Sequence, residues 1–430
     1  MRPENLHRWW LIKDTPVLFT DLYELTMAQA YFDRNMRGAA FFEVTIRRLP
    51  ENWGFFVMAG LAELEEYLKA FRFAPEDLEY LRCTKFFTDE FLAFLSNLKI
   101  DVKLRALPEG TAFLANEPIL EVEGDLISAQ ILETYILNIL GFSIISASLA
   151  SRIIIAAKSV PVVDFGLRRS QGPVAAFRVA RAAQMAGFAA TSNVYAAKLL
   201  DFAATGTMAH SFVEVHETEE QSFLNYARLY GEKAVFLIDT YEPTSGIITA
   251  AKVASQIYKE TGVKVAGIRI DSGPLVKLSR FARTHFEEAG VPFLKIFVSG
   301  DLDEYAIADL LENGAQIDGI GIGTRFAVSR YAPSVDIVYK IVRYADRDIS
   351  KTSPDKQSRP GRKSIRRIGD KTFEKDIVSQ YTRDDNDLLK PFTAADDMST
   401  IQSRLAEQLS HLPPAVKQIK NPAEHPVIFA

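Results

Sequence analysis

Short apolar runs that end in small or polar residues recur through the middle of the chain. Most intervals between them have the apolar spacing of a helix, as in residues 173–186 and 273–290. Strands and helices that alternate at intervals of roughly 20 to 30 residues are typical of βαβ units, and their repetition predicts a (β/α) barrel. The seven runs are VVDFG (162–166), FAATSN (188–193), ATGTMAHS (204–211), VFLIDTY (235–241), AGIRIDSG (266–273), IFVSGD (296–301) and DGIGIGT (318–324).

The residues before this region mix helical and strand-like patterns. Alternation of apolar and polar residues predicts a strand over residues 39–48 and short strands within 99–124. Apolar spacing predicts helices over residues 15–33, 55–72, 75–97 and 126–158. On the second of these helices, Glu63, Glu65 and Glu66 are expected to be exposed.

The pattern weakens after Arg343. Residues 345–368 are polar and include the basic run RPGRKSIRR at 359–367, for which a solvated loop or hairpin is favoured over a nucleic-acid patch. Residues 371–430 are expected to form an exposed helix and a tail that return to the N-terminal module. We therefore predict an α/β fold with three segments. They are a strand-rich α+β N-terminal module (1–130), an irregular (β/α) barrel that is the catalytic domain (131–343), and a C-terminal extension packed on the N-terminal module (344–430).

Composition narrows the class of protein. An apolar fraction of 48% over 430 residues supports a large core, and a net charge of -5 is too small to suggest a nucleic-acid binder. The single cysteine, Cys83, excludes an internal disulfide framework and a Cys-rich zinc site, and it fits a reducing cytosol.

One apolar segment resembles a membrane span. Residues 134–151 carry no charge over 18 residues, which is near the lower limit for a spanning helix. The segment contains Asn138 and Gly141, and Glu133 and Arg152 flank it closely, so a buried core helix is favoured. Residues 1–16 lack a continuous apolar stretch, so no signal peptide is expected. We therefore expect a cytoplasmic protein with no membrane partner.

The polar residues follow the apolar runs, and in a parallel barrel all such ends converge on one face. Two of these ends contain glycines that can present backbone N–H groups to a phosphate, Ser299-Gly300-Asp301 and the run GIGIGT at 319–324. Tight strand packing is the alternative for the second. The chain has neither a P-loop nor the glycine spacing of a dinucleotide-binding fingerprint. The expected mouth also holds Asp164, His210, Asp239 and Asp271.

Three further features assign chemistry to this mouth. Arg168 and Arg169, beside Phe165, suit a planar anion, because arginine pairs bidentately with carboxylate or phosphate while a ring stacks above; surface salt bridges are the alternative. His210 follows a small, flexible turn, which favours catalysis over a structural role. Asp271 can orient ribose hydroxyls or hold Mg²⁺. These residues predict a site for a phosphorylated sugar with His210 as its reactive side chain.

From Thr20 to about Arg343 the chain resembles the nicotinate phosphoribosyltransferase family. Eight of the family's motifs occur in the same order and at similar spacing, which makes coincidence a poor explanation. They are TDLYELTM (20–27), FGLRRSQGP (165–173), ATSN (190–193), GTMAHSF (206–212), IDTY (238–241), IRIDSG (268–273), SGDLDEY (299–305) and IGIGT (320–324).

The resemblance implies a reaction in NAD biosynthesis. Nicotinate and phosphoribosyl pyrophosphate give nicotinate mononucleotide and pyrophosphate, and ATP hydrolysis is coupled through transient phosphorylation of a histidine, which falls on His210. It implies Mg²⁺ and no zinc, and a homodimer with shared active sites to which Tyr23 is donated by the partner. Tyr23 and Phe165 would then sandwich the pyridine ring.

The resemblance also implies the remaining contacts. Thr207, Arg168 and Arg269 would serve the nicotinate carboxylate and a neighbouring phosphate. Ser192 stands where nicotinamide-using relatives place a carboxylate, which would repel nicotinate, so Ser192 favours the acid as substrate. The residues expected to hold the phosphoribosyl group are Ser299, Gly300, Gly321, Gly323 and Thr324.

One position departs from the family pattern. The family usually has an aspartate where this chain has Pro274, and the missing carboxylate puts a second metal or sugar contact in doubt. A catalytically impaired paralogue and a nicotinamide-using enzyme therefore remain alternatives. A Schiff-base aldolase is disfavoured, because it needs a lysine at a strand end and none of the seven runs ends in one.

Overall fold

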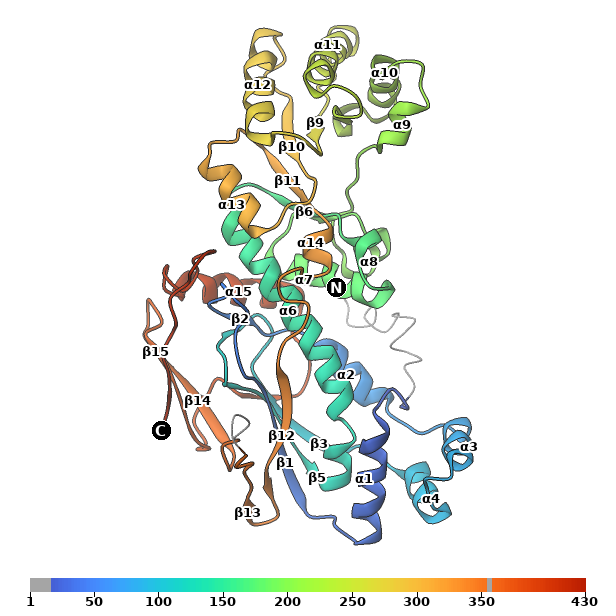
Figure 1. The fold of residues 1–430 in the computed structure, drawn as a ribbon, viewed down its shortest axis with the longest axis vertical. Coiled ribbons are helices and arrows are strands. Elements are labelled where there is room, and N and C mark those ends of the chain that lie inside the picture. Colours follow the sequence, from blue (N-terminus) through green and yellow to red (C-terminus); the bar gives the residue numbers. More distant parts are fainter. Residues whose placement is uncertain (1–16, 354–357) are drawn as a thin grey trace. The chain divides into compact units, whose positions relative to one another are not determined.

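The computed structural model describes residues 17–353 and 358–430 (Figure 1), so the expectation for residues 1–16 lies outside the described part. The chain divides into two compact units. Unit 1 comprises Met1–Ser148 and Tyr331–Ala430, and unit 2 comprises Leu149–Arg330. The division into three segments that the sequence suggests stays a prediction.

A parallel sheet of six strands forms the centre of unit 2, in the order β7-β6-β11-β10-β9-β8. Six of the seven apolar runs supply these strands, which confirms the predicted α/β alternation. The strands are β6 (Val162–Asp164), β7 (Ala190–Thr191), β8 (Val235–Leu237), β9 (Gly267–Ile270), β10 (Lys295–Val298) and β11 (Gly319–Ile322).

Helices occupy the intervals between these strands. Their apolar faces are buried: in α11, for example, Ile247, Ala250 and Ala254 are fully buried. The helices of unit 2 are η2 (Leu167–Arg169), α7 (Pro173–Ala186), α8 (Val194–Leu200), α9 (His210–Glu214), α10 (Glu219–Tyr230), η3 (Gly231–Lys233), α11 (Pro243–Thr261), α12 (Leu275–Glu288), α13 (Glu304–Glu312) and α14 (Thr324–Ala327).

The seventh run, residues 204–211, was expected to be a strand with a polar end, and this expectation was wrong. Ala204 makes only an isolated parallel bridge to Thr191, and a loop leads from there to His210, the first residue of α9. The physical reason is a lack of buried side chains, since Met208 is the one residue of the run that is buried and Gly206 has no side chain to pack. His210 therefore projects from a helix start.

Unit 1 is built on an antiparallel sheet of six strands, in the order β13-β12-β1-β5-β3-β16. The pairing of β16 with β3 confirms that the C-terminal segment returns to the N-terminal module. These strands are β1 (Ala39–Ile46), β3 (Val102–Ala106), β5 (Pro118–Asp125), β12 (Ile337–Tyr344), β13 (Arg347–Asp348) and β16 (Lys390–Phe392).

Smaller sheets and helices complete unit 1. The small sheets contain β2 (Phe56–Val57) with β4 (Ala112–Phe113), and β14 (Lys363–Ile368) with β15 (Lys375–Gln380) and β17 (Val427–Phe429). The helices are α1 (Leu22–Asp33), α2 (Leu61–Ala70), α3 (Pro75–Thr84), α4 (Asp89–Asn97), α5 (Leu126–Gln130) and α15 (Met398–His411). The long helix α6 (Glu133–Ala157) runs from unit 1 into unit 2.

Two helix predictions in this unit need correction. The helix expected over 55–72 begins only at Leu61, because the preceding residues are buried and include β2, and Glu63 is buried rather than exposed. The helix expected over 75–97 is two helices, α3 and α4, since Lys85 adopts a left-handed conformation (φ 60°) and Thr88 caps the second helix through a hydrogen bond from the Phe91 N–H.

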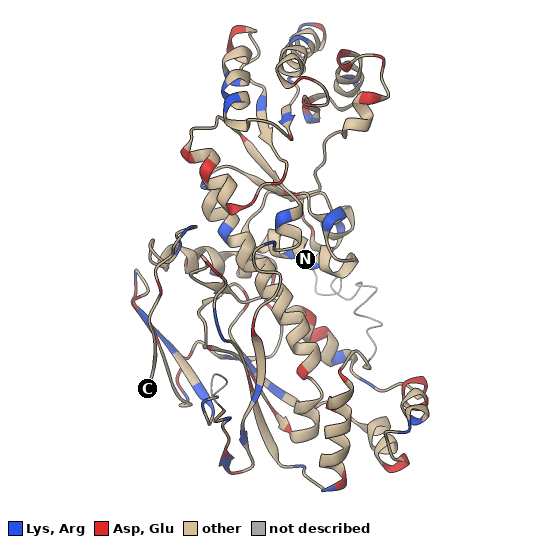
Figure 2. Ribbon diagram, viewed as in Figure 1, with Lys and Arg blue, Asp and Glu red and all other residues tan. Residues whose placement is uncertain are grey.

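The basic run 359–367 was expected to be a solvated loop or hairpin, and its second half does form a hairpin, since β14 pairs antiparallel with β15, although parts of it are buried. Three of its cations, Arg362, Lys363 and Arg367, are paired with carboxylates of unit 1; Figure 2 colours the charged residues along the chain. Arg362 lies 2.6 Å from Glu121, Lys363 lies 2.7 Å from Glu43, and Arg367 lies 2.6 Å from Asp376. These three charges are neutralised inside the fold, which leaves little of the run to act as a basic patch.

The apolar segment that resembles a membrane span is a core helix. Leu126–Ala157 is long and apolar enough to cross a membrane, but 83% of its most apolar window is buried inside the structure. Ile136, Ile139 and Leu140 of α6 are fully buried. The prediction of a buried core helix is confirmed.

Candidate active site

Arg269, the third residue of β9, joins three of the predicted site elements of unit 2. Its Nη1 donates a hydrogen bond of 2.6 Å to Oγ1 of Thr207, and its Nη2 lies 3.2 Å from Oδ1 of Asp271. The guanidinium carbon lies 5.7 Å from the centroid of the Phe165 ring. The Nε of Arg269 is buried and has no hydrogen-bond partner among the described residues. A cation is therefore fixed beside an aromatic face.

Asp271, just beyond β9, is held by neighbours on both sides. Its carboxylate accepts a hydrogen bond from Ser299 Oγ at the end of β10. Its backbone N–H donates to Oδ2 of Asp239, which also accepts from Ser272 Oγ. Asp239 follows β8, so the ends of three neighbouring strands are linked. Oδ1 of the buried Asp239 has no hydrogen-bond partner within the described ranges.

Two glycines allow the close approaches on which this arrangement depends. Gly300 has a φ of +92°, and a Cβ there would stand 1.7 Å from the carbonyl oxygen of Asp271. A Cβ on Gly321 would stand 2.4 Å from the Phe165 ring. A larger residue would displace the loop at Asp271 in the first case and the Phe165 ring in the second. The predicted glycine ends thus lie against the predicted aromatic and acidic residues.

The turn at Gly300 is fixed by Arg325, a residue that the sequence did not single out. Arg325 of α14 pairs with both Asp301 and Asp303, and its hydrogen bond to Asp301 lowers the pKa of that carboxyl. Two carboxylates within three residues, followed by an arginine next to the last glycine run, are the only sign of this clamp in the sequence.

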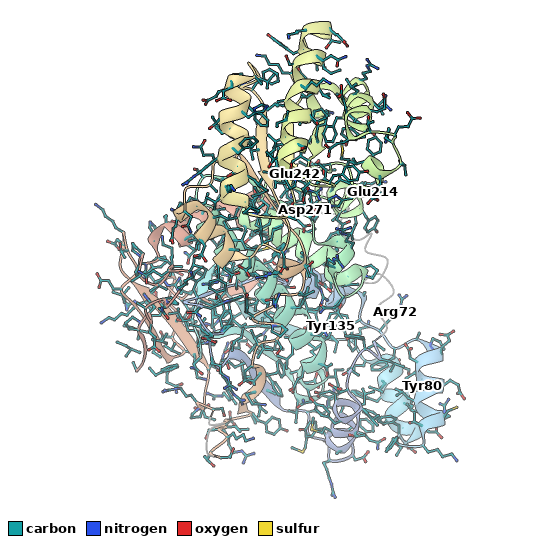
Figure 3. The ribbon with its side chains drawn as sticks, turned by 45° about the horizontal axis from the view of Figure 1, so that its top comes forward. Arg72, Tyr80, Tyr135, Glu214, Glu242 and Asp271 are labelled. Carbon is teal, nitrogen blue, oxygen red and sulfur yellow. The ribbon has the colours of Figure 1, made fainter. Side chains whose placement is uncertain are left out.

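His210 faces the segment that follows β8. Its Nδ1 lies 3.1 Å from Oγ1 of Thr240, the neighbour of Asp239. Glu219, the first residue of α10, was also missed from the sequence. Burial, followed by the negative charges of Asp239 and Glu242, raises the pKa of Glu219 to about 7. Figure 3 labels Glu242 and Asp271 in this part of unit 2.

The structure joins most, but not all, of the predicted residues. Direct contacts and close approaches connect one cluster, made up of Phe165, Thr207, Arg269, Asp271, Ser299, Gly300 and Gly321. Arg168 lies exposed on η2, Ser192 is half-buried just after β7, Gly323 lies against the backbone of Phe165, and Thr324 is the exposed first residue of α14. Tyr23 lies in unit 1, on α1.

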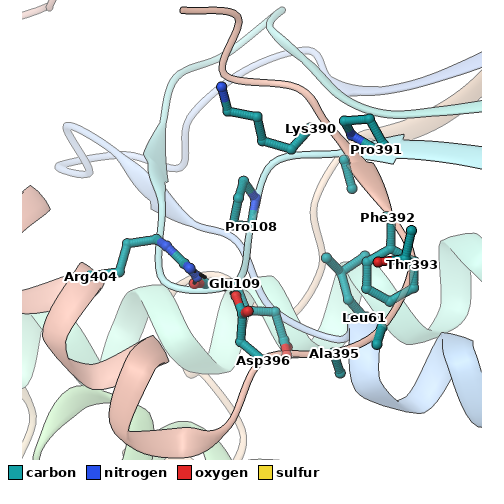
Figure 4. A pocket seen from close by; sticks show the side chains of 12 residues that line it. Leu61, Pro108, Glu109, Lys390, Pro391, Phe392, Thr393, Ala395, Asp396 and Arg404 are labelled. Atoms are coloured by element: carbon teal, nitrogen blue, oxygen red, sulfur yellow. Dashed lines mark hydrogen bonds and ion pairs between the residues drawn. The ribbon is translucent and has the colours of Figure 1, made fainter. Parts of the chain in front are cut away.

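A separate pocket in unit 1 has a volume of about 210 Å³ (Figure 4). Its charged lining residues are already engaged with their surroundings. Arg404 donates to the carbonyl oxygen of Glu109 (2.6 Å) and pairs with Asp396 (2.8 Å), while the Lys390 ammonium donates to the carbonyl oxygen of Asp385. The charged groups of this pocket are thus committed to contacts within unit 1.

The ends of the parallel sheet carry a fixed arginine, an aromatic face and glycine turns, an arrangement typical of α/β enzymes with their site at the strand ends. Comparison with known sequences gives the family. The profile of the nicotinate phosphoribosyltransferase N-terminal domain matches residues 18–141, and that of the nicotinate phosphoribosyltransferase family matches residues 160–385. The chain belongs to the nicotinate phosphoribosyltransferase family, which confirms the resemblance noted from its motifs.

Several relatives support this assignment over most of their length. The chain is 41% identical to nicotinate phosphoribosyltransferase pncB2 of Mycobacterium tuberculosis, over 85% of this chain and 78% of that protein. It is 35% identical to nicotinate phosphoribosyltransferase of Bacillus subtilis, over 96% of this chain and 93% of that protein.

Solved structures share the fold. The crystal structure of human nicotinic acid phosphoribosyltransferase has a TM-score of 0.80 at 24% identity, covering 96% of this chain and 97% of that one. Nicotinate-nucleotide pyrophosphorylase from Pyrococcus furiosus has a TM-score of 0.74 at 26% identity, covering 93% and 97%.

Proposed function

We propose that this protein transfers the phosphoribosyl group of phosphoribosyl pyrophosphate to nicotinate, forming nicotinate mononucleotide and pyrophosphate for NAD biosynthesis. The family assignment supports the reaction. The structural observation behind the proposed site is the cluster around Arg269, in which Arg269 bonds to Thr207 and Asp271 beside the Phe165 ring. A pyridine ring stacked on Phe165 places its carboxylate near a cation and a hydroxyl, which suits nicotinate better than an uncharged amide.

The chemistry requires one bond to form and one to break. The ring nitrogen of nicotinate attacks the anomeric carbon of the sugar, and the bond from that carbon to the pyrophosphate oxygen breaks. Positive charge develops on the ribose while negative charge grows on the leaving group. Because the pyridine nitrogen is a modest nucleophile, positioning by Phe165 and Arg269 supplies much of the rate. The glycine turns at Gly300 and Gly321 to Thr324 hold the phosphate of the sugar.

Mg²⁺ is the metal that this reaction class implies. The described residues contain no group of three His, Cys, Asp or Glu side chains arranged to hold a metal. That fits Mg²⁺, which commonly uses one or two protein carboxylates together with substrate phosphates. Asp271 would hold the ion, and bound Mg²⁺ would neutralise charge on the pyrophosphate.

The ATP-coupled step falls on His210. Nδ1 of His210 lies 3.1 Å from Thr240 Oγ1, and in the tautomer in which Nδ1–H donates to that hydroxyl, Nε2 carries a free lone pair. Nε2 attacks the terminal phosphorus of ATP, the bond to the bridging oxygen breaks, and ADP leaves. Water later cleaves the phosphohistidine and releases phosphate. The added charge beside Thr240, the neighbour of Asp239, would alter the loops that bind pyrophosphate.

Tyr23 supports the proposal of a homodimer with shared sites. Its side chain is 48% exposed, and Phe19 and Leu22 beside it are 46% and 45% exposed. An aromatic ring left open in this way can complete the pyridine site of a second copy. Light scattering combined with size-exclusion chromatography measures the oligomeric state, and a monomer at assay concentrations would contradict this part of the proposal.

The deciding assay follows nicotinate mononucleotide formation with and without ATP, and with nicotinamide in place of nicotinate. We expect product from nicotinate, stimulation by ATP, and a much lower kcat/KM for nicotinamide. Comparable kcat/KM values for the two bases would favour the nicotinamide-using alternative. Absence of product under both ATP conditions would favour the impaired paralogue that Pro274 suggests; Pro274 precedes α12 without a side-chain cap.

A further inference from the structure

Asp301, in the loop after β10, has a backbone conformation that suits glycine better than aspartate. Its φ is +51°, and the preceding Gly300 also lies in the left-handed region, with a φ of +92°. A side chain in this region is strained by its Cβ atom, although aspartate tolerates it better than most residues. A residue other than glycine keeps such a conformation when its surroundings hold it there.

Arg325, the second residue of α14, provides this support. Its Nη2 lies 2.5 Å from Oδ2 of Asp301, and its Nη1 pairs with Oδ2 of Asp303. Asp303 in turn accepts a hydrogen bond of 2.8 Å from the Ala306 N–H and caps α13. One guanidinium therefore holds both the strained residue and the start of the helix that follows it.

The same arginine joins the two strand ends that we assign to the phosphate of the sugar. Asp301 directly follows Gly300 after β10, and Arg325 directly follows Thr324 after β11. The two ion pairs thus fix the loop after β10 against the end of the glycine run 319–324. Both strand ends belong to unit 2, so these contacts lie within one compact unit.

The loop after β10 also has backbone donors to spare. Within the described ranges, the N–H groups of Gly300, Asp301 and Leu302 donate no hydrogen bond to the chain. Gly300 and Asp301 are exposed. Backbone N–H groups of this kind suit an anion such as phosphate, whose oxygens accept several hydrogen bonds. The direction in which these N–H groups point depends on the two left-handed φ angles.

The charges of the loop assign the binding of phosphate to the backbone rather than to the arginines. Arg325 is committed to Asp301 and Asp303, and Arg330 lies 4.0 Å from Asp301. Two carboxylates thus face two guanidinium groups, which leaves little net charge to attract an anion. The contribution of Arg325 is therefore to the shape of the loop.

We propose that Arg325 is a positioning residue for phosphoribosyl pyrophosphate, which holds Asp301 in the left-handed conformation so that the loop after β10 directs its N–H groups at the 5-phosphate. The inference rests on the proposed function, which supplies the phosphorylated sugar. It implies that Arg325 becomes dispensable once residue 301 is glycine, because glycine adopts this conformation without a side chain that must be held.

The test compares D301A with D301G in the full-length enzyme. Both variants remove the carboxylate and its pair with Arg325, and they differ only in the methyl group that disfavours a φ of +51°. We expect D301A to raise KM for phosphoribosyl pyrophosphate about tenfold and D301G to stay within about threefold of wild type, with kcat and KM for nicotinate unchanged in both. Equal KM values for the two variants would overturn the inference, because only the charge of Asp301 would then matter.

A second comparison tests Arg325 itself and decides the question if D301A does not fold. R325K keeps a cation beside Asp303, but lysine cannot bridge two carboxylates with a planar group. R325K should raise KM for phosphoribosyl pyrophosphate about as much as D301A, whereas R325K combined with D301G should show no increase over D301G alone. A further increase in the combined variant would mean that Arg325 does not act through residue 301.

Asp201 offers a matched control. It has the same φ of +51° at the C-terminal end of α8 and forms no ion pair among the residues that the structure describes. D201A should have a lower Tm than D201G because of backbone strain, and both should leave KM for phosphoribosyl pyrophosphate unchanged. If D201A raised this KM as much as D301A does, the effect would be one of general stability and the role of Arg325 would be refuted.

Calorimetric titration with phosphoribosyl pyrophosphate separates the inference from the function beneath it. If the wild type binds this compound but forms no nicotinate mononucleotide, the proposed function is wrong, and the ratio of Kd between D301A and D301G still decides the role of Arg325. If D301A and R325K form product with the wild-type KM, the function stands and the inference is wrong. A wild type that does not bind the compound would contradict both.

Discussion

The Nη1 atom of Arg269 lies 2.6 Å from Oγ1 of Thr207, although 62 positions separate the two residues in the sequence. This bond joins β9 to the loop before α9 and orients the guanidinium beside Phe165. Under the proposed function, this rigid cation at the ring face selects an anionic base.

Replacing Arg269 by lysine should therefore be severe. A lysine keeps one positive charge but cannot donate to Thr207 and Asp271 at once from a planar group. We expect R269K to lower kcat/KM for nicotinate on the order of a hundredfold, and T207V to raise KM for nicotinate about tenfold, measured by product formation at saturating phosphoribosyl pyrophosphate. T205V, in the same loop, is the control. Equal activity of R269K and wild type would contradict the assigned contact.

The close approach of Gly300 to Asp271 predicts the effect of one added methyl group. A Cβ at position 300 would stand 1.7 Å from the Asp271 carbonyl oxygen at a φ of +92°. G300A should therefore raise KM for phosphoribosyl pyrophosphate by at least about tenfold and cost more than about 2 kcal/mol of stability. Steady-state kinetics and denaturant unfolding measure the two effects.

Gly290 supplies the control for this change. It also has a positive φ, +71°, but nothing lies within 4 Å of its Cβ position. G290A should cost about 1 kcal/mol of stability through backbone strain alone and leave KM unchanged. Similar kinetics for G300A and G290A would show that Gly300 matters only for the backbone conformation and not for the binding of phosphoribosyl pyrophosphate.

His210 carries a narrower prediction. H210A should abolish ATP hydrolysis coupled to product formation and prevent acid-labile labelling by ATP carrying a radioactive terminal phosphate, while slow ATP-independent transfer remains. H216A is the control, since the His216 ring nitrogen lies near the carbonyl oxygen of Phe212 rather than near Thr240. Coupled hydrolysis that survives H210A would show that another residue accepts the phosphoryl group.

Ser192 provides the prediction on base selectivity. An aspartate at this position adds a negative charge on the side where nicotinamide-using relatives carry one. S192D should lower kcat/KM for nicotinate by at least about tenfold through repulsion of its carboxylate, and S192N is the neutral control of similar size. Unchanged selectivity in S192D would place the nicotinate carboxylate away from Ser192.

The parallel strands of unit 2 were predictable because each is a short run of apolar residues followed by a polar end, a pattern contained in the local sequence. The run around Gly206 failed because its apolar character is too sparse to fill a strand position, which shows only when the neighbouring strand is in place. Residues such as Arg325 and Glu219 were missed for a different reason. The carboxylates that pair with Arg325 are distant in the sequence, and the pKa of Glu219 is raised by burial. Neither property leaves a pattern in the local sequence.

Unit 1 shows the same limit of prediction from local sequence in its charged residues. The basic run containing Arg362 and Lys363 has the composition of a solvated segment, but its partners Glu121 and Glu43 lie more than 200 positions away. Spacing cannot reveal such pairs. The motif that contains Tyr23 was recognisable, whereas the burial of Glu24 against Gln130 depends on the packing of α1 on α5.

The amide of Gln130, which donates to Glu24 Oε2 at 2.7 Å and to Glu133 Oε2 at 3.3 Å, leads to a prediction about pH. Burial, followed by the negative charge of Glu24, raises the pKa of Glu133 to about 7, while Lys340 opposes the shift. The ordinary pKa of a glutamate in an unfolded chain is about 4.3, so the folded protein binds this proton more tightly. The stabilising contribution is full below about pH 4.3 and is lost as the pH rises through about 7. The free energy of unfolding changes by at most about 1.4 kcal/mol per pH unit from this group, and by less here because Glu133 is partly exposed.

Tm measured from pH 5 to 8 should therefore fall in the wild type relative to E133Q as the pH rises, with the difference levelling above about pH 7.5. The exposed Glu90 supplies the control, since E90Q should shift Tm by the same amount throughout this range. A constant difference between wild type and E133Q would show that Glu133 is already ionised at pH 5.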